Sequence, residues 1–320
     1  MPSSDVSVII PTYNRLSMLE EALASVYSQD FDGVVEIIVV DDNSQDGTSE
    51  IVSRKYPEIR LISFKQNVGA YVARNRALLE AKGKYIAFLD SDDLWETSYL
   101  KTQIAALEGK ERCFCISALV IWDTVKDQKG IALQKPDLDR YSSPIHHLLV
   151  SNFIITPSSV VFPRQTFDEV GLFDEKFKVG GDAELYIRCL LSGYNLIFTE
   201  PPVAIKREHG KDQLTNTKNL KLKQKCRFMR IDKFYALSEG RFDILPIRRI
   251  YAETHANFAS QYFKKNDFLH WLISSIAVAY NASPRYALSN MISDIRSLLK
   301  INTKLRMMHC YIKNLFYLFN

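Results

Sequence analysis

Apolar and polar positions alternate in a regular order along the first 90 residues. Residues 6–10 form a short β-branched apolar run that ends at Pro11, as expected for a strand buried in a parallel sheet. The apolar residues that follow are Leu16, Leu19, Leu23 and Val26. Their helical spacing predicts an amphipathic helix directly after the first strand.

The same alternation continues to residue 89. The predicted segments are strands at residues 34–40, 59–64 and 85–89, with helices at residues 48–56 and 69–82. Gly83 is the expected stop of the last of these helices. Strands that alternate with helices predict an α/β fold, a mostly parallel, twisted sheet flanked by helices on both faces.

The pattern changes after residue 110. Further strands are predicted at residues 113–122, 158–163 and 195–201, and a helix at residues 181–194. Beyond about residue 215 the apolar spacing is helical almost throughout, with Pro246 and Pro284 as breaks. We therefore expect one domain at residues 1–212 and a basic, mainly helical C-terminal region of unassigned role at residues 213–320.

The distribution of charge separates these two parts. The 320 residues carry a net charge of +4, but residues 1–202 hold 20 Lys and Arg against 29 Asp and Glu, whereas residues 203–320 hold 21 against 8. The basic part could contact anionic lipid at a membrane surface, form an oligomer or simply solvate a helical lobe packed on the first domain. Nucleic acid is not an expected partner, because no recognised nucleic-acid-binding module accompanies the charge.

Signals for secretion or membrane insertion are missing from the sequence. The five cysteines show no CxxC spacing, and the N-terminus has no basic start of the kind found in signal peptides. The most apolar later stretch, residues 269–280, is too short to span a bilayer. We expect a cytoplasmic protein, with a peripheral position on the inner membrane face as the alternative.

Polar clusters follow each of the four predicted strands. The clusters are PTYNR after the first strand, DDNSQDG after the second, KQNVG after the third and DSDD after the fourth. In open parallel sheets, ligands bind beyond the carboxyl ends of the strands. The sequence therefore predicts that four polar loops converge on one edge of the sheet.

The segment FLDSDD at residues 88–93 suggests a bound cation. Carboxylates on Asp90 and Asp92 would lie roughly 6 Å apart at a strand end and would repel each other by about 3 kcal/mol at an effective dielectric constant near 20. Mg²⁺ or Mn²⁺ would offset this repulsion, since these ions take oxygen ligands and commonly combine one or two carboxylates with substrate phosphates. Water and turn chemistry are the structural alternative for a single Asp-Ser-Asp.

Other phosphate-binding arrangements do not match. A dinucleotide site needs G-x-G-x-x-G after the first strand, where this chain has PTYNRL, and a P-loop is equally absent. No His and Cys spacing typical of zinc appears. A nucleotidyltransferase would need a glycine-rich, arginine-bearing loop that the segment PTYNRLSM lacks.

Five segments in series resemble the inverting nucleotide-sugar glycosyltransferases of family 2. The segments are VSVIIPTYNR, IIVVDDNSQDGT, NVGAYVARN, FLDSDD and GGDAELYIRCLLSGY. The resemblance covers roughly residues 5–212 and implies a GT-A fold, in which residues 1–212 bind and use a nucleoside-diphosphate sugar. It further implies an acceptor hydroxyl on a glycan or a lipid-linked glycan, as in polysaccharide, cell-surface glycan or glycolipid synthesis.

The resemblance assigns roles to individual residues around the donor. Pro11, Thr12 and Tyr13 would line the base pocket. Asp42 would accept a hydrogen bond from the base, supported by Asp41. Arg74 and Ser91 would contact the nucleotide, Asp90 the ribose or the metal, and Asp92 would be the principal metal ligand. The structural alternatives are strand-end packing for Tyr13, a turn cap for either Asp41 or Asp42 and a solvated helix face for Arg74.

Asp182 is the expected catalytic base, because inversion requires one carboxylate to take the proton of the acceptor hydroxyl. The family often has Glu-Asp at this point, whereas this chain has Gly181 before Asp182, and Glu184 is the alternative base. His209 falls where many members carry a histidine near the metal, and Arg207 could neutralise phosphate. A nucleotide-sugar-binding subunit without activity is the alternative function, because Gly181 replaces an acid.

Overall fold

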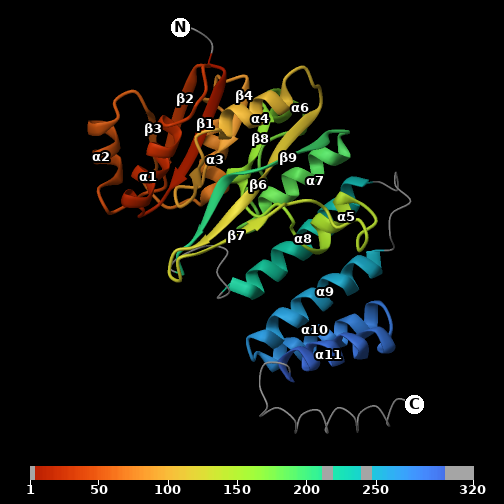
Figure 1. Cartoon of the computed structure of the whole chain (residues 1–320). Coiled ribbons are helices and arrows are strands. Elements are labelled where there is room, and N and C mark those ends of the chain that lie inside the picture. The colour runs from red at the N-terminus through yellow and green to blue at the C-terminus, as the bar shows by residue number, and fades with distance from the viewer. Residues whose placement is uncertain (1–3, 211–218, 239–246, 300–320) are drawn as a thin grey trace. The chain divides into compact units, whose positions relative to one another are not determined.

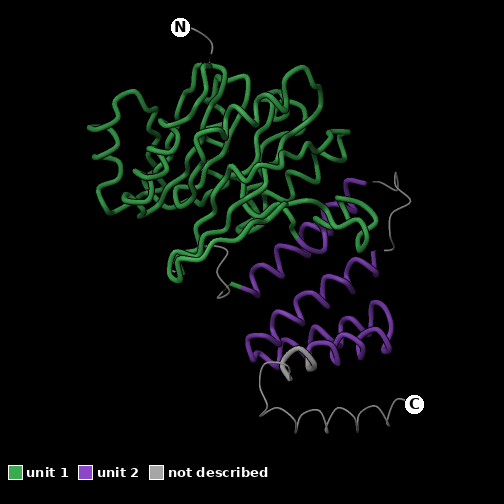
Figure 2. Tube along the Cα trace, in the orientation of Figure 1, with its two compact units in different colours: residues 1–148, 152–219 green, residues 149–151, 220–320 purple. Residues whose placement is uncertain are grey.

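The computed structural model describes residues 4–210, 219–238 and 247–299 (Figure 1). Two compact units contain residues 1–148 with 152–219, and residues 149–151 with 220–320 (Figure 2). The boundary expected at residue 212, and Pro246 as a helix break, lie outside the described residues.

The described part of the first unit contains one nine-stranded mixed sheet, in the order β3-β2-β1-β4-β8-β6-β9-β5, with β7 paired to β6. Its strands are β1 (Val6–Thr12), β2 (Val35–Asp41), β3 (Arg60–Ser63), β4 (Tyr85–Phe88), β5 (Leu94–Trp95), β6 (Cys113–Asp123), β7 (Gln128–Ala132), β8 (Val160–Pro163) and β9 (Asn195–Glu208). The first four strands are parallel, as expected. Beyond β4 the sheet contains both parallel and antiparallel pairs.

Helices cover both faces of this sheet (Figure 1). They are α1 (Leu16–Tyr27), α2 (Thr48–Lys55), α3 (Ala70–Leu78), α4 (Tyr99–Leu107), α5 (Pro144–Val150), α6 (Gln165–Val170) and α7 (Gly181–Leu191), with a 3₁₀ turn η1 at Pro157–Ser159. Alternate side chains of β4 point to opposite faces. Ala87 joins a core with Leu23 of α1 and Leu100 of α4, whereas Phe88 packs edge-on against Phe167 of α6.

Two antiparallel pairings determine what lies beyond the end of β4. Ala87 of β4 pairs with Val161 of β8, so the residues that precede β8 lie beyond the carboxyl end of β4. Leu94 of β5 pairs with Ile205 of β9, so the residues after Ile205 run beside the residues that precede β5. Segments far apart in the sequence thus meet at the aspartates of the DSDD cluster.

Gly83 has a different role from the helix stop that the sequence predicts. Helix α3 ends at Leu78, before the predicted end. Gly83 instead lies against β1, where its N–H donates to Ser7 Oγ at 2.8 Å. A Cβ at this position would lie 2.4 Å from the backbone nitrogen of Ser7. Glycine is required here by the close approach of two backbones.

The second unit is helical in its described part. Its helices are α8 (Leu220–Ser238), α9 (Ile247–Lys264), α10 (Phe268–Asn281) and α11 (Pro284–Leu299). Phe258, Tyr262 and Phe263 of α9 form its core with Trp271 of α10. Pro284 is the first residue of α11, a position where proline is favoured because its missing N–H is not needed. Within the described ranges, no helix combines the length and the apolar character needed to cross a membrane.

Candidate active site

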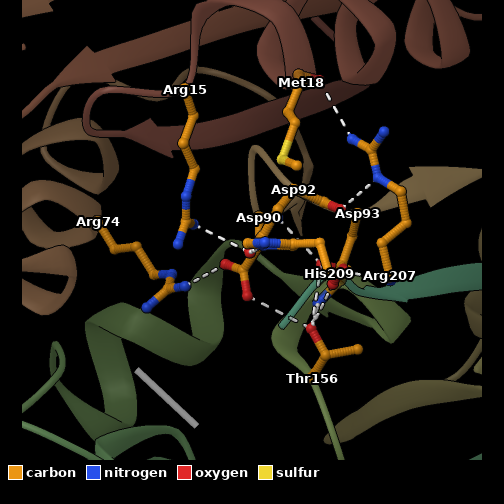
Figure 3. A network of polar contacts seen from close by, with 10 residues as sticks. Arg15, Met18, Arg74, Asp90, Asp92, Asp93, Thr156, Arg207 and His209 are labelled. Atoms are coloured by element: carbon orange, nitrogen blue, oxygen red, sulfur yellow. Dashed lines mark hydrogen bonds and ion pairs between the residues drawn. The ribbon is translucent and has the colours of Figure 1, made fainter. Parts of the chain in front are cut away.

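Three aspartates with different partners follow β4. Asp90, Asp92 and Asp93 follow the strand, and Figure 3 shows them in one network with Arg15, Arg74, Thr156, Arg207 and His209.

Asp92 is the aspartate that meets both a histidine and an arginine. Its Oδ2 lies 3.0 Å from Arg15 Nη1 and 3.2 Å from His209 Nε2, and the residue is 8% exposed. Burial by itself would raise the pKa of Asp92, but the Arg15 charge and the His209 hydrogen bond hold that pKa below its ordinary value. Asp92 is therefore an ionised carboxylate in a sheltered position.

Asp93 is buried and is held by hydroxyl and backbone donors. Its Oδ2 accepts from Thr156 Oγ1 at 2.8 Å and from Ser158 Oγ at 2.7 Å, and its Oδ1 accepts from the Arg207 N–H at 3.2 Å. Burial, with the nearby Asp92 charge as the second cause, raises the pKa of Asp93 to about 7. Asp93 joins β5, β9 and η1 behind the site, a structural role that the sequence analysis did not assign.

Asp90 is tied to helix α3. Its Oδ1 accepts from Arg74 Nη2, and its Oδ2 lies 3.4 Å from Thr156 Oγ1, whose proton is donated to Asp93. Ser158 Oγ also accepts from the Asp90 N–H at 3.0 Å. Ser91, the next residue, is almost fully buried. Arg74 and Asp90, both expected at the nucleotide, are thus brought together.

Arg207 fixes the backbone of Asp92. Its Nε donates to the carbonyl oxygen of Asp92 at 2.5 Å, and its other nitrogens bond the carboxylate of Glu21 and the carbonyl oxygen of Met18 (Figure 3). The guanidinium is buried. These contacts with the protein differ from the phosphate contact that the sequence suggested.

The metal expected from the sequence can be tested against these donors. Asp92 Oδ2 and His209 Nε2 converge; the carboxylate oxygen is a ligand type that both Mn²⁺ and Mg²⁺ bind together with substrate phosphates, whereas the imidazole nitrogen suits Mn²⁺ better than Mg²⁺. The described residues contain no group of three His, Cys, Asp or Glu side chains able to hold an ion. Asp92 and His209 therefore fit an incomplete cage that needs diphosphate oxygens and water as further ligands.

The residues expected to line a base pocket lie at the ends of β1 and β2. Pro11 and Thr12 are buried at the end of β1, and Tyr13 is 45% exposed just beyond it. Thr12 Oγ1 is buried without a hydrogen-bond partner among the described residues. A buried hydroxyl of this kind is costly unless something bonds to it. It is a polar group that a ligand could satisfy.

Asp41, the last residue of β2, and Asp42 both make structural contacts. The carboxylate of Asp42 accepts the N–H groups of Val68 at 2.7 Å and Gly69 at 2.8 Å, which connects β2 to the start of α3. Asp41 Oδ1 accepts the Ser44 N–H at 2.9 Å. Asp41 therefore has the turn contact named as its structural alternative, while each Asp42 oxygen retains a further lone pair for a ligand.

Asp182 lies in the first turn of α7, where the helix dipole favours a negative charge. Its Oδ1 accepts from the Tyr71 hydroxyl at 3.2 Å, and Asn152 Nδ2 lies 3.5 Å from its Oδ2. The Tyr71 hydroxyl also accepts the Gly181 N–H at 2.8 Å. Burial and the Asp182 charge raise the pKa of Tyr71, so its hydroxyl remains a donor.

Gly181 makes room for this tyrosine. A Cβ at position 181 would lie 3.0 Å from Tyr71 Cε2, which is tighter than ordinary packing. The ring of Tyr71 thus occupies space next to the residue where the family often has Glu. The missing acid and the presence of Tyr71 are two aspects of one local arrangement.

Glu184, the alternative base, has a different environment. It is 3% exposed, and its carboxylate is paired with Arg188 at Nε–Oε1 and Nη2–Oε2 distances of 2.7 and 3.0 Å. Arg188 in turn donates to the carbonyl oxygens of Val170 and Leu172. Glu184 is therefore part of the packing between α7 and α6, which favours Asp182 over Glu184 as the base.

A continuous set of contacts connects the aspartates after β4 to Asp182. Asp90 bonds Arg74, the Arg74 guanidinium carbon lies 5.5 Å from the centre of the Tyr71 ring, and Tyr71 bonds Asp182. Arg15 and Tyr71 stand in segments that the sequence analysis singled out, but without a role there. Asn152 and Thr156 lie between the strands predicted at residues 113–122 and 158–163, in a segment without a recognised sequence signal.

Comparisons with known proteins show which family the chain resembles. A family model described as glycosyl transferase family 2 matches residues 7–171. The uncharacterized glycosyltransferase RT0329 of Rickettsia typhi is 31% identical over 226 residues, which are 66% of this chain and 66% of that protein. The UDP-Glc:alpha-D-GlcNAc-diphosphoundecaprenol beta-1,3-glucosyltransferase WfaP of Escherichia coli is 43% identical over 114 residues, which are 35% of this chain and 45% of WfaP. The chain thus spans just under two thirds of the first relative and under half of the second.

Solved structures match the fold over most of the chain. The mannosyltransferase PcManGT from Pyrobaculum calidifontis, in complex with GDP-Man and Mn²⁺, has a TM-score of 0.58 at 19% identity, with 98% of this chain and 85% of that chain covered. At this identity the likeness concerns the fold alone. It confirms the GT-A architecture expected from the sequence.

Proposed function

The chain belongs to glycosyl transferase family 2, and from this premise we propose that it moves a sugar from a nucleoside-diphosphate sugar to an acceptor hydroxyl with inversion at the anomeric carbon. The observation that carries the proposal is the sheltered pair of Asp92 and His209 beside Asp90, which contacts through Arg74 and Tyr71 connect to another carboxylate, Asp182. One carboxylate serves the leaving group and the other the nucleophile.

Asp182 acts as the general base. It takes the proton of the acceptor hydroxyl while that oxygen forms a bond to the anomeric carbon, and the bond from that carbon to the diphosphate breaks on the opposite face with its electron pair. Tyr71 and Asn152 hold the Asp182 carboxylate in place. Because the nucleophile attacks directly, a single base is sufficient.

Asp92 and His209 would hold Mn²⁺ or Mg²⁺, which would neutralise the charge that develops on the departing diphosphate. Arg15, now paired with Asp92, would turn towards the phosphates. Asp90 stays with Arg74 and faces the ribose, and Ser91 contributes its backbone to the nucleotide site. Thr12, Tyr13 and Asp42 contact the base, with Pro11 as part of the pocket wall.

The relatives guide the choice of substrates. WfaP is named for transfer from UDP-Glc to a diphosphoundecaprenol-linked sugar, and the PcManGT structure contains GDP-Man. We therefore propose a nucleotide sugar as the donor, and a glycan or lipid-linked glycan of the cell surface as the acceptor.

Two substitutions separate donor binding from chemistry. Asp92→Asn should weaken Mn²⁺-dependent binding of UDP or GDP and lower transfer or donor hydrolysis by at least about 100-fold, because it removes a charged metal ligand. Asp182→Asn should keep nucleotide binding and lower transfer by about 100- to 10,000-fold. Calorimetric titration of the nucleotide, with a radiolabelled-donor assay, measures both quantities.

The control is Asp30→Asn, which alters an exposed carboxylate paired with Lys101 and should change neither quantity. Full activity of Asp92→Asn in excess EDTA would contradict the metal role. A wild-type chain that binds nucleotide with Mn²⁺ but turns over no donor would instead support a binding subunit without activity.

A further inference from the structure

Helix α10 turns a continuous apolar face to solvent. Leu269, Leu272, Ile273, Ile276 and Tyr280 are between 45% and 82% exposed. Their spacing of three or four residues, with one adjacent pair, places them on one side of the helix. We call these five residues the outer face of α10.

The opposite side of the same helix is the more polar one. It buries Ser274 and Ser275 beside Trp271 and Val278. Ser275 Oγ donates to the Trp271 carbonyl oxygen at 2.8 Å, and Ser274 Oγ accepts from Gln224 of α8 at 3.4 Å. A helix of a soluble unit normally buries its leucines and isoleucines and exposes its serines. The reversed arrangement indicates that the outer face is covered when the protein works.

Positive charge lies beyond both ends of α10. Exposed Lys264 and Lys265 precede α10, and exposed Arg285 follows it. The acidic residue nearest the start of α10 is Asp267, and its carboxylate is hydrogen-bonded to the ring and the backbone N–H of His270. Residues 220–238 and 247–299 carry 12 Lys and Arg against 4 Asp and Glu. Such an excess attracts an anionic surface and opposes a second copy of the same unit.

We propose that the outer face of α10 docks on an anionic lipid bilayer, with its aliphatic side chains in the boundary between headgroups and acyl chains. Apolar residues on one helix face, flanked by cations, are the features that let a helix lie in the membrane interface without spanning it. Anionic headgroups supply the complementary charge. This proposal goes beyond the glycosyl transfer and does not depend on it.

Vesicle co-sedimentation of the full chain tests the proposal. Wild type should bind vesicles of phosphatidylglycerol and phosphatidylcholine and bind pure phosphatidylcholine vesicles at least tenfold more weakly. The double variant Ile273→Asn/Ile276→Asn should lose at least tenfold in binding to the anionic vesicles. Both residues are exposed, so the variant should fold, and circular dichroism with thermal melting checks this.

A matched control comes from the first unit. Ile131 on β7 is 68% exposed, close to the 61% of Ile276, and Ile131→Asn should bind vesicles like wild type. Equal binding by the double variant and wild type would overturn the proposal, as would absence of wild-type binding or equal binding to neutral vesicles. A wild-type dimer that the double variant dissociates, seen by sedimentation velocity, would mean that a second copy covers the face and would also overturn it.

Discussion

Asp92 combines burial with two positively polarised neighbours, Arg15 and His209. A carboxylate with 8% exposure would be costly to ionise without them. Arg15 and His209 approach the same oxygen, while Arg207 fixes the backbone of Asp92 from behind. The oxygen is therefore ionised and aimed before any ligand arrives. In the proposed mechanism a cation would take the place of Arg15 beside this oxygen.

Tyr71→Phe should lower kcat by roughly tenfold and leave the donor KM unchanged, because the hydroxyl holds Asp182 and not the nucleotide. Steady-state kinetics over a range of donor concentrations measures the two parameters. Tyr27→Phe is the matched control, since it also removes a tyrosine–carboxylate hydrogen bond, to Glu58, but on the exposed surface. A raised donor KM with normal kcat would argue against this role for Tyr71.

The residues that sequence reasoning identified are those in contiguous polar segments. Asp90 and Asp92 follow a strand, and Asp182 starts a helix, so local pattern and family resemblance suffice to select them. Thr156 was not predicted, because its contact with Asp93 exists only through the antiparallel pairing of β8 with β4. Arg207 was considered for phosphate binding. Its contact with Glu21 of α1 was not predicted, because that contact also depends on long-range strand pairing.

The order of the later strands in the sheet is the feature of the fold that the sequence predicted least well. The first four parallel strands follow from alternating apolar segments, each strand joined to the next by a helix. β9 was predicted to end at residue 201 but continues to Glu208, because its pairing with β6 and β5 supplies hydrogen bonds past two prolines. That extension carries His209 to Asp92.

His255 offers a pH test of the packing between α8 and α9. Its ring lies 4.5 Å from the Phe228 ring, and its buried Nδ1 has no hydrogen-bond partner among the described residues. Burial lowers the pKa of His255 from 6.5 to about 4. Between these pH values the unfolded chain binds a proton that the folded unit does not, so the free energy of unfolding falls as the pH drops through this window.

His255→Leu should remove this loss. The free energy of unfolding of the variant minus that of wild type should be about 1 to 2 kcal/mol larger at pH 4.5 than at pH 7.5. This value is smaller than the full pKa shift would give, because the ring is only partly buried. Urea unfolding of both chains at the two pH values gives the difference. An identical wild-type-to-variant difference at both pH values would contradict the assignment.

Two units of opposite charge character make up the whole molecule. The first carries the residues of the candidate active site, and the described part of the second is a basic set of helices with its own core. We propose that residues 1–212 and 213–320 behave as separate domains. Composition and helical spacing predict this division, whereas the reversed polarity of α10 was not recognised, because sequence alone does not tell which side of an apolar helix is buried.

Differential scanning calorimetry should resolve two unfolding transitions if the domains are separate. UDP or GDP with Mn²⁺ should raise the midpoint of one transition only, since a ligand stabilises the unit that binds it. EDTA should remove most of that increase. A single transition that shifts as a whole would contradict independent domains.

We propose that Asp92 and His209 bind the cation that coordinates the donor's diphosphate. Crystals grown with UDP or GDP and Mn²⁺, measured at the manganese absorption edge, test it directly. We expect one anomalous peak, from the manganese ion, within bonding distance of Asp92, His209 and both phosphates. A nucleotide bound with its diphosphate held by Arg15 and no anomalous peak beside Asp92 would contradict it.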